Sequence, residues 1–159
     1  MKSILLIGLR LFCTSCFVHG GRMINGQCRP KNPNFKLTKI PFKDSDLLAF
    51  NKIYIADDKT NAMGYGFHPD GRIIYVHSKD GLTLKIEDII NKTWNNAPAI
   101  GYWRMERNKI KTEYFSCSNS GNYIRKQGYI KGDTIFLNEI VGQDHSSKKY
   151  VMINIFYPI

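Results

Sequence analysis

Hydrophobic and polar residues alternate over most of the chain from about residue 50 onward, and short polar turns separate the alternating runs. A period of two places successive side chains on opposite faces of a sheet, so this pattern predicts β-strands. Pro69-Asp70-Gly71 and Gly132-Asp133 are combinations that favour tight reversals between strands. The expected strands, eight in number, cover residues 51–56, 63–68, 73–76, 100–106, 109–115, 122–130, 134–140 and 149–157.

The clearest expected hairpin covers residues 100–115, with Arg107-Asn108 as a two-residue turn. This turn predicts three core-facing pairs, which are Met105 with Ile110, Trp103 with Thr112, and Gly101 with Tyr114. The opposite face is then polar and solvated, as in an antiparallel sheet with one wet face. Its residues are Tyr102, Arg104, Glu106, Lys109, Lys111 and Glu113.

One segment departs from the period of two. Its apolar residues recur at helical spacing before Asn95-Asn96-Ala97-Pro98 ends the run, and they are Ile86, Ile89, Ile90 and Trp94. We therefore expect one short helix of about ten residues between the third and fourth strands, with its apolar side on the sheet. Together these elements predict a mainly β fold, an antiparallel up-and-down meander of about eight strands that forms a barrel or a partly open barrel.

The first residues have a different pattern, in which Lys2 precedes an apolar run that ends at Cys13-Thr14-Ser15-Cys16. This pattern resembles a lipoprotein export signal, in which the last cysteine is acylated before cleavage. We expect residues 1–15 to be a signal peptide, residues 16–48 a lipidated N-terminus and tether, and residues 49–159 the barrel-like domain. The alternatives are ordinary secretion with cleavage after Gly20, and a cytosolic protein with an apolar first strand.

The expected tether lacks a hydrophobic period. Gly20-Gly21, Asn25-Gly26 and the prolines within residues 29–34 favour extended backbone without sheet pairing. Such a composition suits a spacer between a membrane anchor and a folded domain.

The net charge of the chain bears on whether it binds nucleic acid or anionic lipid. The chain carries 23 Lys and Arg against 13 Asp and Glu, a formal charge of +10. Loss of Lys2 and Arg10 with the signal lowers this charge to +8. The basic residues are scattered among acidic and apolar ones, and no nucleic-acid-binding motif accompanies them. We therefore expect no nucleic-acid partner, and a solvated basic surface that rests against anionic lipid head groups.

Two cysteines, Cys28 and Cys117, remain if Cys13 leaves with the signal and Cys16 carries lipid. In an oxidising compartment they form a disulfide or stay as two free thiols, and the sequence leaves both options open. In the chain-entropy model, a disulfide that closes so long a loop stabilises the fold by roughly 4 kcal/mol. Neither cysteine belongs to a C-x-x-C pair, so we expect no metal site.

No catalytic motif stands out. Asp144-His145-Ser146-Ser147 contains the residue types of a hydrolase triad, but neighbours in one loop do not converge as triad groups must. His68 and His77 flank one expected hairpin on opposite faces, roughly 17 Å apart along a strand and too distant to share a metal. We expect a protein without enzymatic activity, cofactor or metal.

Three segments carry a resemblance to a known group. They are FHPDGRIIY at residues 67–75, GYWRMERNKIKTEYF at 101–115 and GYIKGDTIFL at 128–137. These segments are similar to small, mostly uncharacterised lipoproteins of Bacteroidota that are described as lipocalin-like. The resemblance covers roughly residues 16–157, and it implies an eight-stranded barrel-like fold and a place in the cell envelope. It implies no catalytic residue, because the matching segments are structural turns and strands.

These observations predict a lipid-anchored protein of the bacterial envelope, held through Cys16 to the periplasmic side of the outer membrane. Its barrel would bind a small hydrophobic molecule or lipid in a cavity lined by aromatic residues, the candidates being Trp103, Tyr114, Tyr75 and Tyr129. A core filled by those side chains is the competing interpretation. The alternative function is a protein-interaction or structural component of the envelope, acting through Arg104, Lys111 and their neighbours on the outer sheet face.

Overall fold

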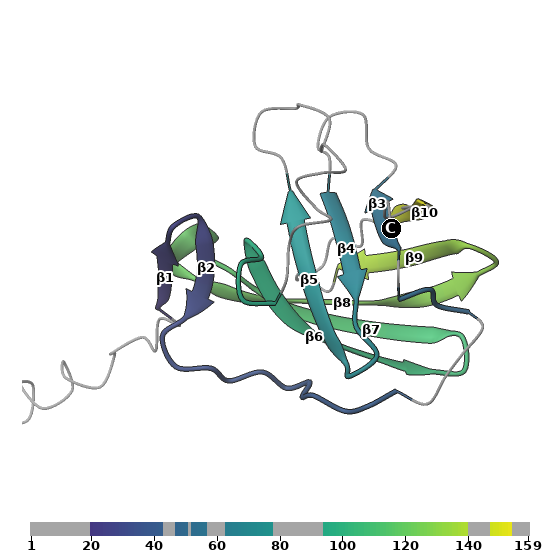
Figure 1. Cartoon of the computed structure of the whole chain (residues 1–159), viewed down its shortest axis with the longest axis horizontal. Coiled ribbons are helices and arrows are strands. Elements are labelled where there is room, and N and C mark those ends of the chain that lie inside the picture. Colours follow the sequence, from purple (N-terminus) through teal and green to yellow (C-terminus); the bar gives the residue numbers. More distant parts are fainter. Residues whose placement is uncertain are drawn as a thin grey trace, which may run out of the picture.

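Eight antiparallel strands close into a barrel in the computed structural model of the chain, and a two-stranded hairpin stands at one end of the barrel (Figure 1). The structure describes residues 20–42, 47–50, 52–56, 63–77, 94–139 and 147–153. The hairpin consists of β1 (Gly21–Ile24) and β2 (Gln27–Pro30). The remaining elements are β3 (Ile53–Ala56), β4 (Met63–Phe67), β5 (Arg72–His77), β6 (Ala99–Glu106), β7 (Lys109–Ser116), the short 3-10 helix η1 (Ser118–Ser120), β8 (Asn122–Lys131), β9 (Thr134–Glu139) and β10 (Ser147–Ile153).

The barrel strands follow one another in chain order, and β10 closes the barrel by pairing with β3. This arrangement confirms the expected mainly β, up-and-down meander, because each strand pairs antiparallel with the next strand along the chain. The helix expected near residues 86–94 falls almost entirely outside the described residues, where Trp94 alone of its apolar positions is described, in a turn. Residues 1–19, with the expected signal peptide and Cys16, also lie outside them.

The register of β6 and β7 is the one that a turn at Arg107-Asn108 predicts. The three core-facing pairs are Met105 with Ile110, Trp103 with Thr112, and Gly101 with Tyr114. Arg107 adopts a φ of 58°, the left-handed conformation that such a turn requires. All the side chains of these pairs are buried, so the hydrophobic period and the turn type together place this hairpin correctly.

Two glycines let neighbouring strands approach closely. A side chain at Gly101 on β6 would overlap the carbonyl oxygen of Glu113 on β7. A side chain at Gly128 on β8 would likewise overlap the carbonyl oxygen of Phe136 on β9. Because backbone atoms block both positions, any larger residue would have to push two strands apart.

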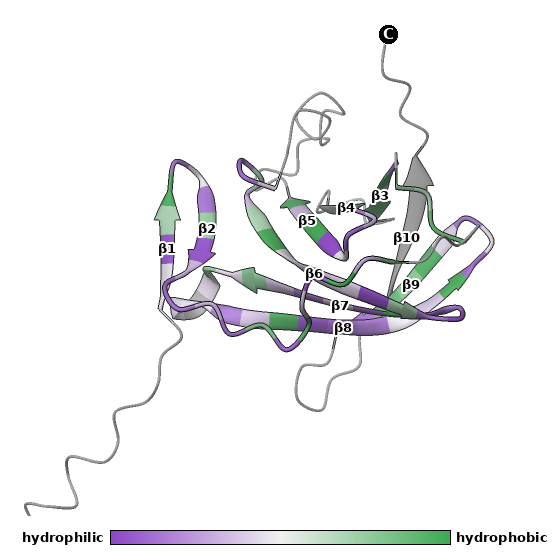
Figure 2. Ribbon diagram, turned by 60° about the horizontal axis from the view of Figure 1, so that its bottom comes forward, coloured by the Kyte–Doolittle hydropathy of each residue, from purple (hydrophilic) through white to green (hydrophobic). Residues whose placement is uncertain are grey.

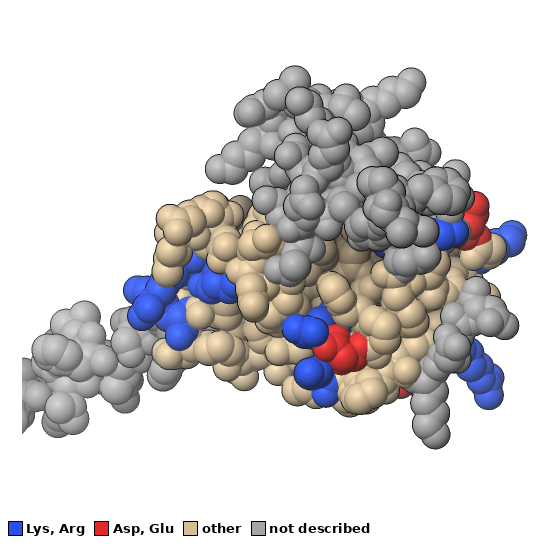
Figure 3. All heavy atoms as spheres, in the orientation of Figure 1, with Lys and Arg blue, Asp and Glu red and all other residues tan. Residues whose placement is uncertain are grey.

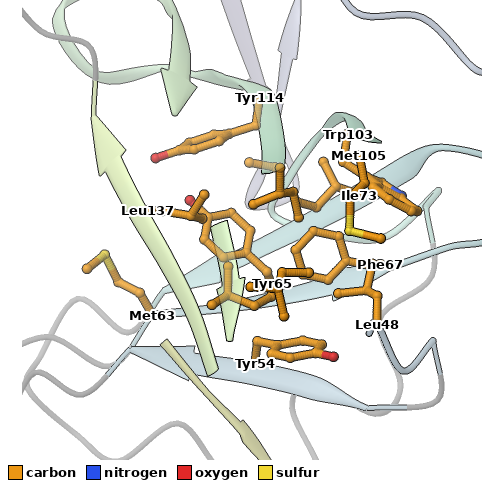
Figure 4. Packing of buried hydrophobic residues seen from close by; sticks show 14 residues of the cluster. Leu48, Tyr54, Met63, Tyr65, Phe67, Ile73, Trp103, Met105, Tyr114 and Leu137 are labelled. Atoms are coloured by element: carbon orange, nitrogen blue, oxygen red, sulfur yellow. The ribbon is translucent and has the colours of Figure 1, made fainter. Parts of the chain in front are cut away.

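Buried hydrophobic side chains pack together inside the barrel (Figure 4), and at one end, which we call the closed end, aromatic rings fill the interior. Trp103 is 2% exposed, and its Nε1 donates a hydrogen bond to the His68 carbonyl oxygen at 3.0 Å. Phe42 and Phe50, which precede the first barrel strand, reach the same ring with centroid distances of 5.0 and 5.8 Å. Phe67 meets it edge-on at 5.7 Å. This end is therefore a solid hydrophobic core.

A segment that we call the strap, residues 31–42, runs from the hairpin to the closed end across the outer face of β6, β7 and β8 (Figures 1 and 2). Phe35 of the strap packs edge-on against Tyr102 and Tyr123, with ring centroids 5.0 and 4.9 Å apart. At its far end, the backbone N–H of Phe42 donates to the Pro69 carbonyl oxygen at 2.7 Å. The strap is thus attached to the barrel along its length.

Two expectations are wrong in this region. The sequence predicts unpaired backbone before residue 34, whereas β1 and β2 form an antiparallel hairpin. Glu113, expected on a solvated face, is fully buried. The backbone N–H of Leu37 in the strap donates to its Oε2 at 2.8 Å, and Arg125 Nε binds its Oε1 at 2.8 Å. Alternation along β7 assigns Glu113 to the outer face correctly, but it carries no information on which distant segment covers that face.

Candidate functional site

A cleft of about 690 Å³ lies between the β1–β2 hairpin and the end of the barrel opposite the closed end, which we call the mouth. The hairpin forms one wall of this cleft, and barrel strands form the other. The lining is mainly apolar and aromatic with a few hydroxyl groups, and it consists of Met23, Gly26, Cys28, Tyr75, Pro98, Ala99, Tyr114, Ser116, Cys117 and Ser118.

The hairpin wall is fixed to the barrel by a disulfide between Cys28 and Cys117, whose Cα atoms are 5.6 Å apart. The structure thus contains the pairing that the sequence left open. The backbone N–H of Cys28 also donates to the Pro98 carbonyl oxygen at 2.7 Å. The guanidinium of Arg29 donates to the carbonyl oxygen of Ala97 at 3.0 Å. Covalent and polar contacts together therefore hold this wall at a defined distance from the barrel.

The barrel wall is formed by two stacked tyrosines, Tyr75 on β5 and Tyr114 on β7, with ring centroids 4.3 Å apart and planes at 18°. Strand β6 runs between them and contributes Ala99 opposite Tyr75 and Gly101 opposite Tyr114. Because both β6 residues are small, the two rings meet over this strand. The result is a continuous aromatic surface of the kind that binds apolar or planar ligands.

Lys126 on β8 lies inside the barrel beneath this aromatic wall. It is 5% exposed, and its Nζ lies 5.9 Å from the ring centre of Tyr114 and 6.0 Å from that of Tyr65. Ring faces attract an ammonium group, so the two tyrosines stabilise this buried charge. Sequence reasoning missed Lys126, although the alternation that places Ile130 inside the barrel also places Lys126 inside.

The four predicted cavity residues divide among three environments. Tyr75 and Tyr114 line the cleft between the hairpin and the barrel. Trp103 lies at the filled closed end of the hydrophobic core cluster, which also includes Tyr114. Tyr129 is 45% exposed on the outer surface, where it stacks on Phe136 at 4.8 Å. Placing Tyr129 in a cavity was therefore wrong, because the alternation along β8 points it outward.

The outer sheet face proposed for protein contacts is partly covered. Arg104 and Lys111 pair across β6 and β7, and Lys111 is exposed. The strap lies over neighbouring positions on the same face, where Phe35 contacts Tyr102. The surface left for a partner is accordingly smaller than the sequence predicts.

The turn between β4 and β5 contains an ionic cluster that also includes Lys39 of the strap. Asp70 accepts hydrogen bonds from the Arg72 backbone N–H at 3.1 Å and from Arg72 Nε at 2.6 Å, and Lys39 Nζ of the strap lies 3.5 Å away. Burial opposes ionisation of Asp70, but these hydrogen bonds and the two positive charges hold the pKa of its carboxyl below the ordinary value. Burial, and then the charge of Arg72, lower the pKa of His68, while Asp70 acts in the opposite direction.

Within the described part of the chain, no three His, Cys, Asp or Glu side chains gather as a metal site. No helix in the same part is long and apolar enough to cross a membrane. The side chain of His77 and residues 144–146 of the triad-like segment lie outside the described residues.

Comparison with known proteins yields no relative. No protein-family model matches the chain, and searches of curated proteins and of solved structures found no significant match. The resemblance to lipocalin-like lipoproteins therefore stays an expectation drawn from the sequence.

Proposed function

We propose that this protein is a lipid-anchored component of the bacterial envelope that binds a small apolar molecule or a lipid chain in the cleft at the barrel mouth. The observation that carries this proposal is the stacked pair of Tyr75 and Tyr114, which lines a cleft of about 690 Å³. Ligand sites for small molecules typically measure roughly 300–1,000 Å³ and combine apolar walls with a few polar groups. Met23 and Pro98 extend the apolar wall, and the hydroxyl of Ser116 supplies a polar group.

The position of Cys16 supports attachment close to a membrane. Four peptide units separate Cys16 from Gly20, where the described chain begins, and an extended segment of that length spans roughly 14 Å. A lipid on Cys16 would therefore hold the hairpin, and with it the cleft, near the bilayer surface. Intact mass of the protein from membranes tests the anchor, because Cys16→Ala should remove both the lipid mass and the membrane attachment.

Binding of the uncharged fluorescent probe N-phenyl-1-naphthylamine tests the cleft. Tyr114→Ala should weaken probe binding by up to about tenfold, since loss of one aromatic contact removes up to about 1.5 kcal/mol. Tyr75→Ala should act similarly, because it removes the other ring of the stack.

Tyr129→Ala is the matched control, since Tyr129 is also a stacked tyrosine but lies on the outer surface. Its probe affinity should equal that of the unaltered protein. Equal affinities for the Tyr114 and Tyr129 variants would reject the cleft as the binding site.

A further inference from the structure

The tip of the β1–β2 hairpin exposes apolar residues to water. Ile24 is 55% exposed and Met23 is 58% exposed, and the two are consecutive at the tip, just before the Asn25-Gly26 turn. Large exposed apolar side chains elsewhere in the described residues, such as Ile40 and Tyr129, are not neighbours in the sequence. An exposed apolar pair at the tip of a rigid hairpin is suited to insertion into a surface that is itself apolar below its polar layer.

Positive charge lies along this hairpin and at its base. Arg22 pairs with Arg29 across the hairpin, and Lys31 lies beside Gly20 at its base. Residues 20–31, which form the hairpin and its base, contain Arg22, Arg29 and Lys31 and no Asp or Glu. Figure 3 shows Lys and Arg gathered at the hairpin end without acidic neighbours on that face, in contrast to the mixed cluster near the centre of the view. The charge of the hairpin is therefore complementary to an anionic surface.

The alternation of side chains separates the two faces of the hairpin. Met23 pairs with Cys28 and lines the cleft, so this side of the hairpin faces the barrel. Arg22 and Ile24 alternate with Met23 along β1 and therefore lie on the other side of the hairpin, which we call its outer side. The disulfide at Cys28 fixes the orientation of both faces relative to the barrel.

We propose that the outer side of the β1–β2 hairpin is a membrane-contact surface, with Ile24 inserted among the head groups of an anionic bilayer and Arg22 and Lys31 bound to lipid phosphates. Such a contact would place the opening of the cleft at the bilayer surface, and Met23 would lie between the cleft and the bilayer. A lipid-derived ligand could then enter the cleft without crossing bulk water. The proposal rests on the envelope location proposed above, but the contact itself requires no ligand.

Quenching of tryptophan fluorescence by brominated lipids tests this contact in the full chain bound to vesicles. Two variants, Ile24→Trp and Ile40→Trp, place a new tryptophan at two similarly exposed isoleucines, one on the hairpin tip and one on the strap. The fluorescence of the unaltered chain, with Trp94 and Trp103, is subtracted from both. On anionic phosphatidylglycerol vesicles, we expect quenching at position 24 to exceed that at position 40 by at least about twofold, because interfacial side chains reach the brominated depth.

Charge removal tests the lipid head-group contacts. In the Ile24→Trp background, Arg22→Gln with Lys31→Gln should reduce quenching to the level measured on neutral phosphatidylcholine vesicles. Lys109→Gln with Lys131→Gln removes the same charge from exposed positions at the other end of the barrel and should leave quenching unchanged.

Equal quenching at positions 24 and 40 would overturn the proposal. So would protection of position 24 from lipid by a second copy of the chain or by a protein partner. Neither result would bear on whether the cleft binds N-phenyl-1-naphthylamine, so failure of this contact and failure of the proposed ligand binding are distinguishable.

Discussion

Aromatic side chains lie at both ends of the barrel, but they fill a core at the closed end and line a cleft at the mouth. At the closed end, Trp103 is surrounded by Phe67 and by Phe42 and Phe50 from the chain that leads into the barrel. At the mouth, Tyr114 stacks on a neighbouring tyrosine in a similar way but faces a cleft. The difference lies in what covers each end. Chain that packs into the barrel makes a core, whereas a hairpin held beside the barrel by a disulfide leaves space between them.

The largest expected effect is on the free energy of unfolding, which should distinguish Trp103 in the filled core from Tyr114 beside the cleft. Trp103→Ala should lower the free energy of unfolding by about 3–5 kcal/mol, since it leaves a cavity in a filled core. Tyr114→Ala should cost less, because its ring already borders open space. Urea unfolding of both variants measures the difference. A loss for Tyr114→Ala as large as that for Trp103→Ala would show that the mouth is as tightly packed as the closed end.

Removal of the disulfide should affect the mouth selectively. Cys28→Ser with Cys117→Ser should lower the free energy of unfolding by about 2–4 kcal/mol. It should also abolish binding of N-phenyl-1-naphthylamine, because one wall of the cleft is no longer fixed. The far-ultraviolet circular dichroism of the barrel should stay unchanged. Undiminished probe binding in this variant would mean that the hairpin does not shape the site.

A smaller effect is expected from loosening the strap. Glu113→Gln weakens the contacts of a buried carboxylate with Leu37 and Arg125, and it should cost about 1–3 kcal/mol of unfolding free energy. Trypsin should then cleave faster after Lys36 and Lys39. The exposed Glu106 provides a control, since Glu106→Gln should change stability by less than about 0.5 kcal/mol. Identical cleavage rates for the two variants would contradict this role of Glu113.

The smallest expected effect is the dependence of unfolding free energy on pH, through His68 near the closed end. Because burial and Arg72 lower the pKa of His68, the unfolded chain binds a proton at higher pH than the folded chain does. Stability should therefore fall as pH drops below about 6.5, the ordinary histidine pKa, and the loss is complete once pH passes below the folded pKa. Urea midpoints measured from pH 7.5 to pH 4.5 test this slope. His68→Gln should flatten it, and an unchanged slope would exclude His68 as the source.

Local pattern determines the barrel strands well. The period of two and the turn at Arg107-Asn108 predict the β6–β7 register residue by residue, since strand pairing across a tight turn depends on nearby residues. The same alternation, applied along β8, would have placed Lys126 inside and Tyr129 outside. The omission of Lys126 and the misplacement of Tyr129 both came from residue type, because lysine is usually exposed and tyrosine suggests a pocket.

The candidate site was less predictable because its parts are distant in the sequence. One wall comes from residues before 30, which have no hydrophobic period, and it meets the barrel through Cys117. Burial of Glu113 likewise depends on a strap that is 76 residues away along the chain. Tertiary packing of this kind has no local signature in the sequence. Composition alone therefore predicts a spacer, whereas in the structure the hairpin forms a wall of the cleft and the strap covers the outer face of the barrel.

The disulfide also determines how the molecule responds to mechanical force. Tension applied to the chain before Gly20 enters β1 and reaches Cys28, where the covalent bond transfers it to Cys117 on the barrel. The strap begins after Cys28, at residue 31, so load that passes through the disulfide bypasses it. A protein pulled from its N-terminus would first lose the hydrogen bonds between β1 and β2, while the strap and the closed end stay under no tension. The disulfide thus connects the proposed membrane attachment covalently to the barrel and bypasses the strap.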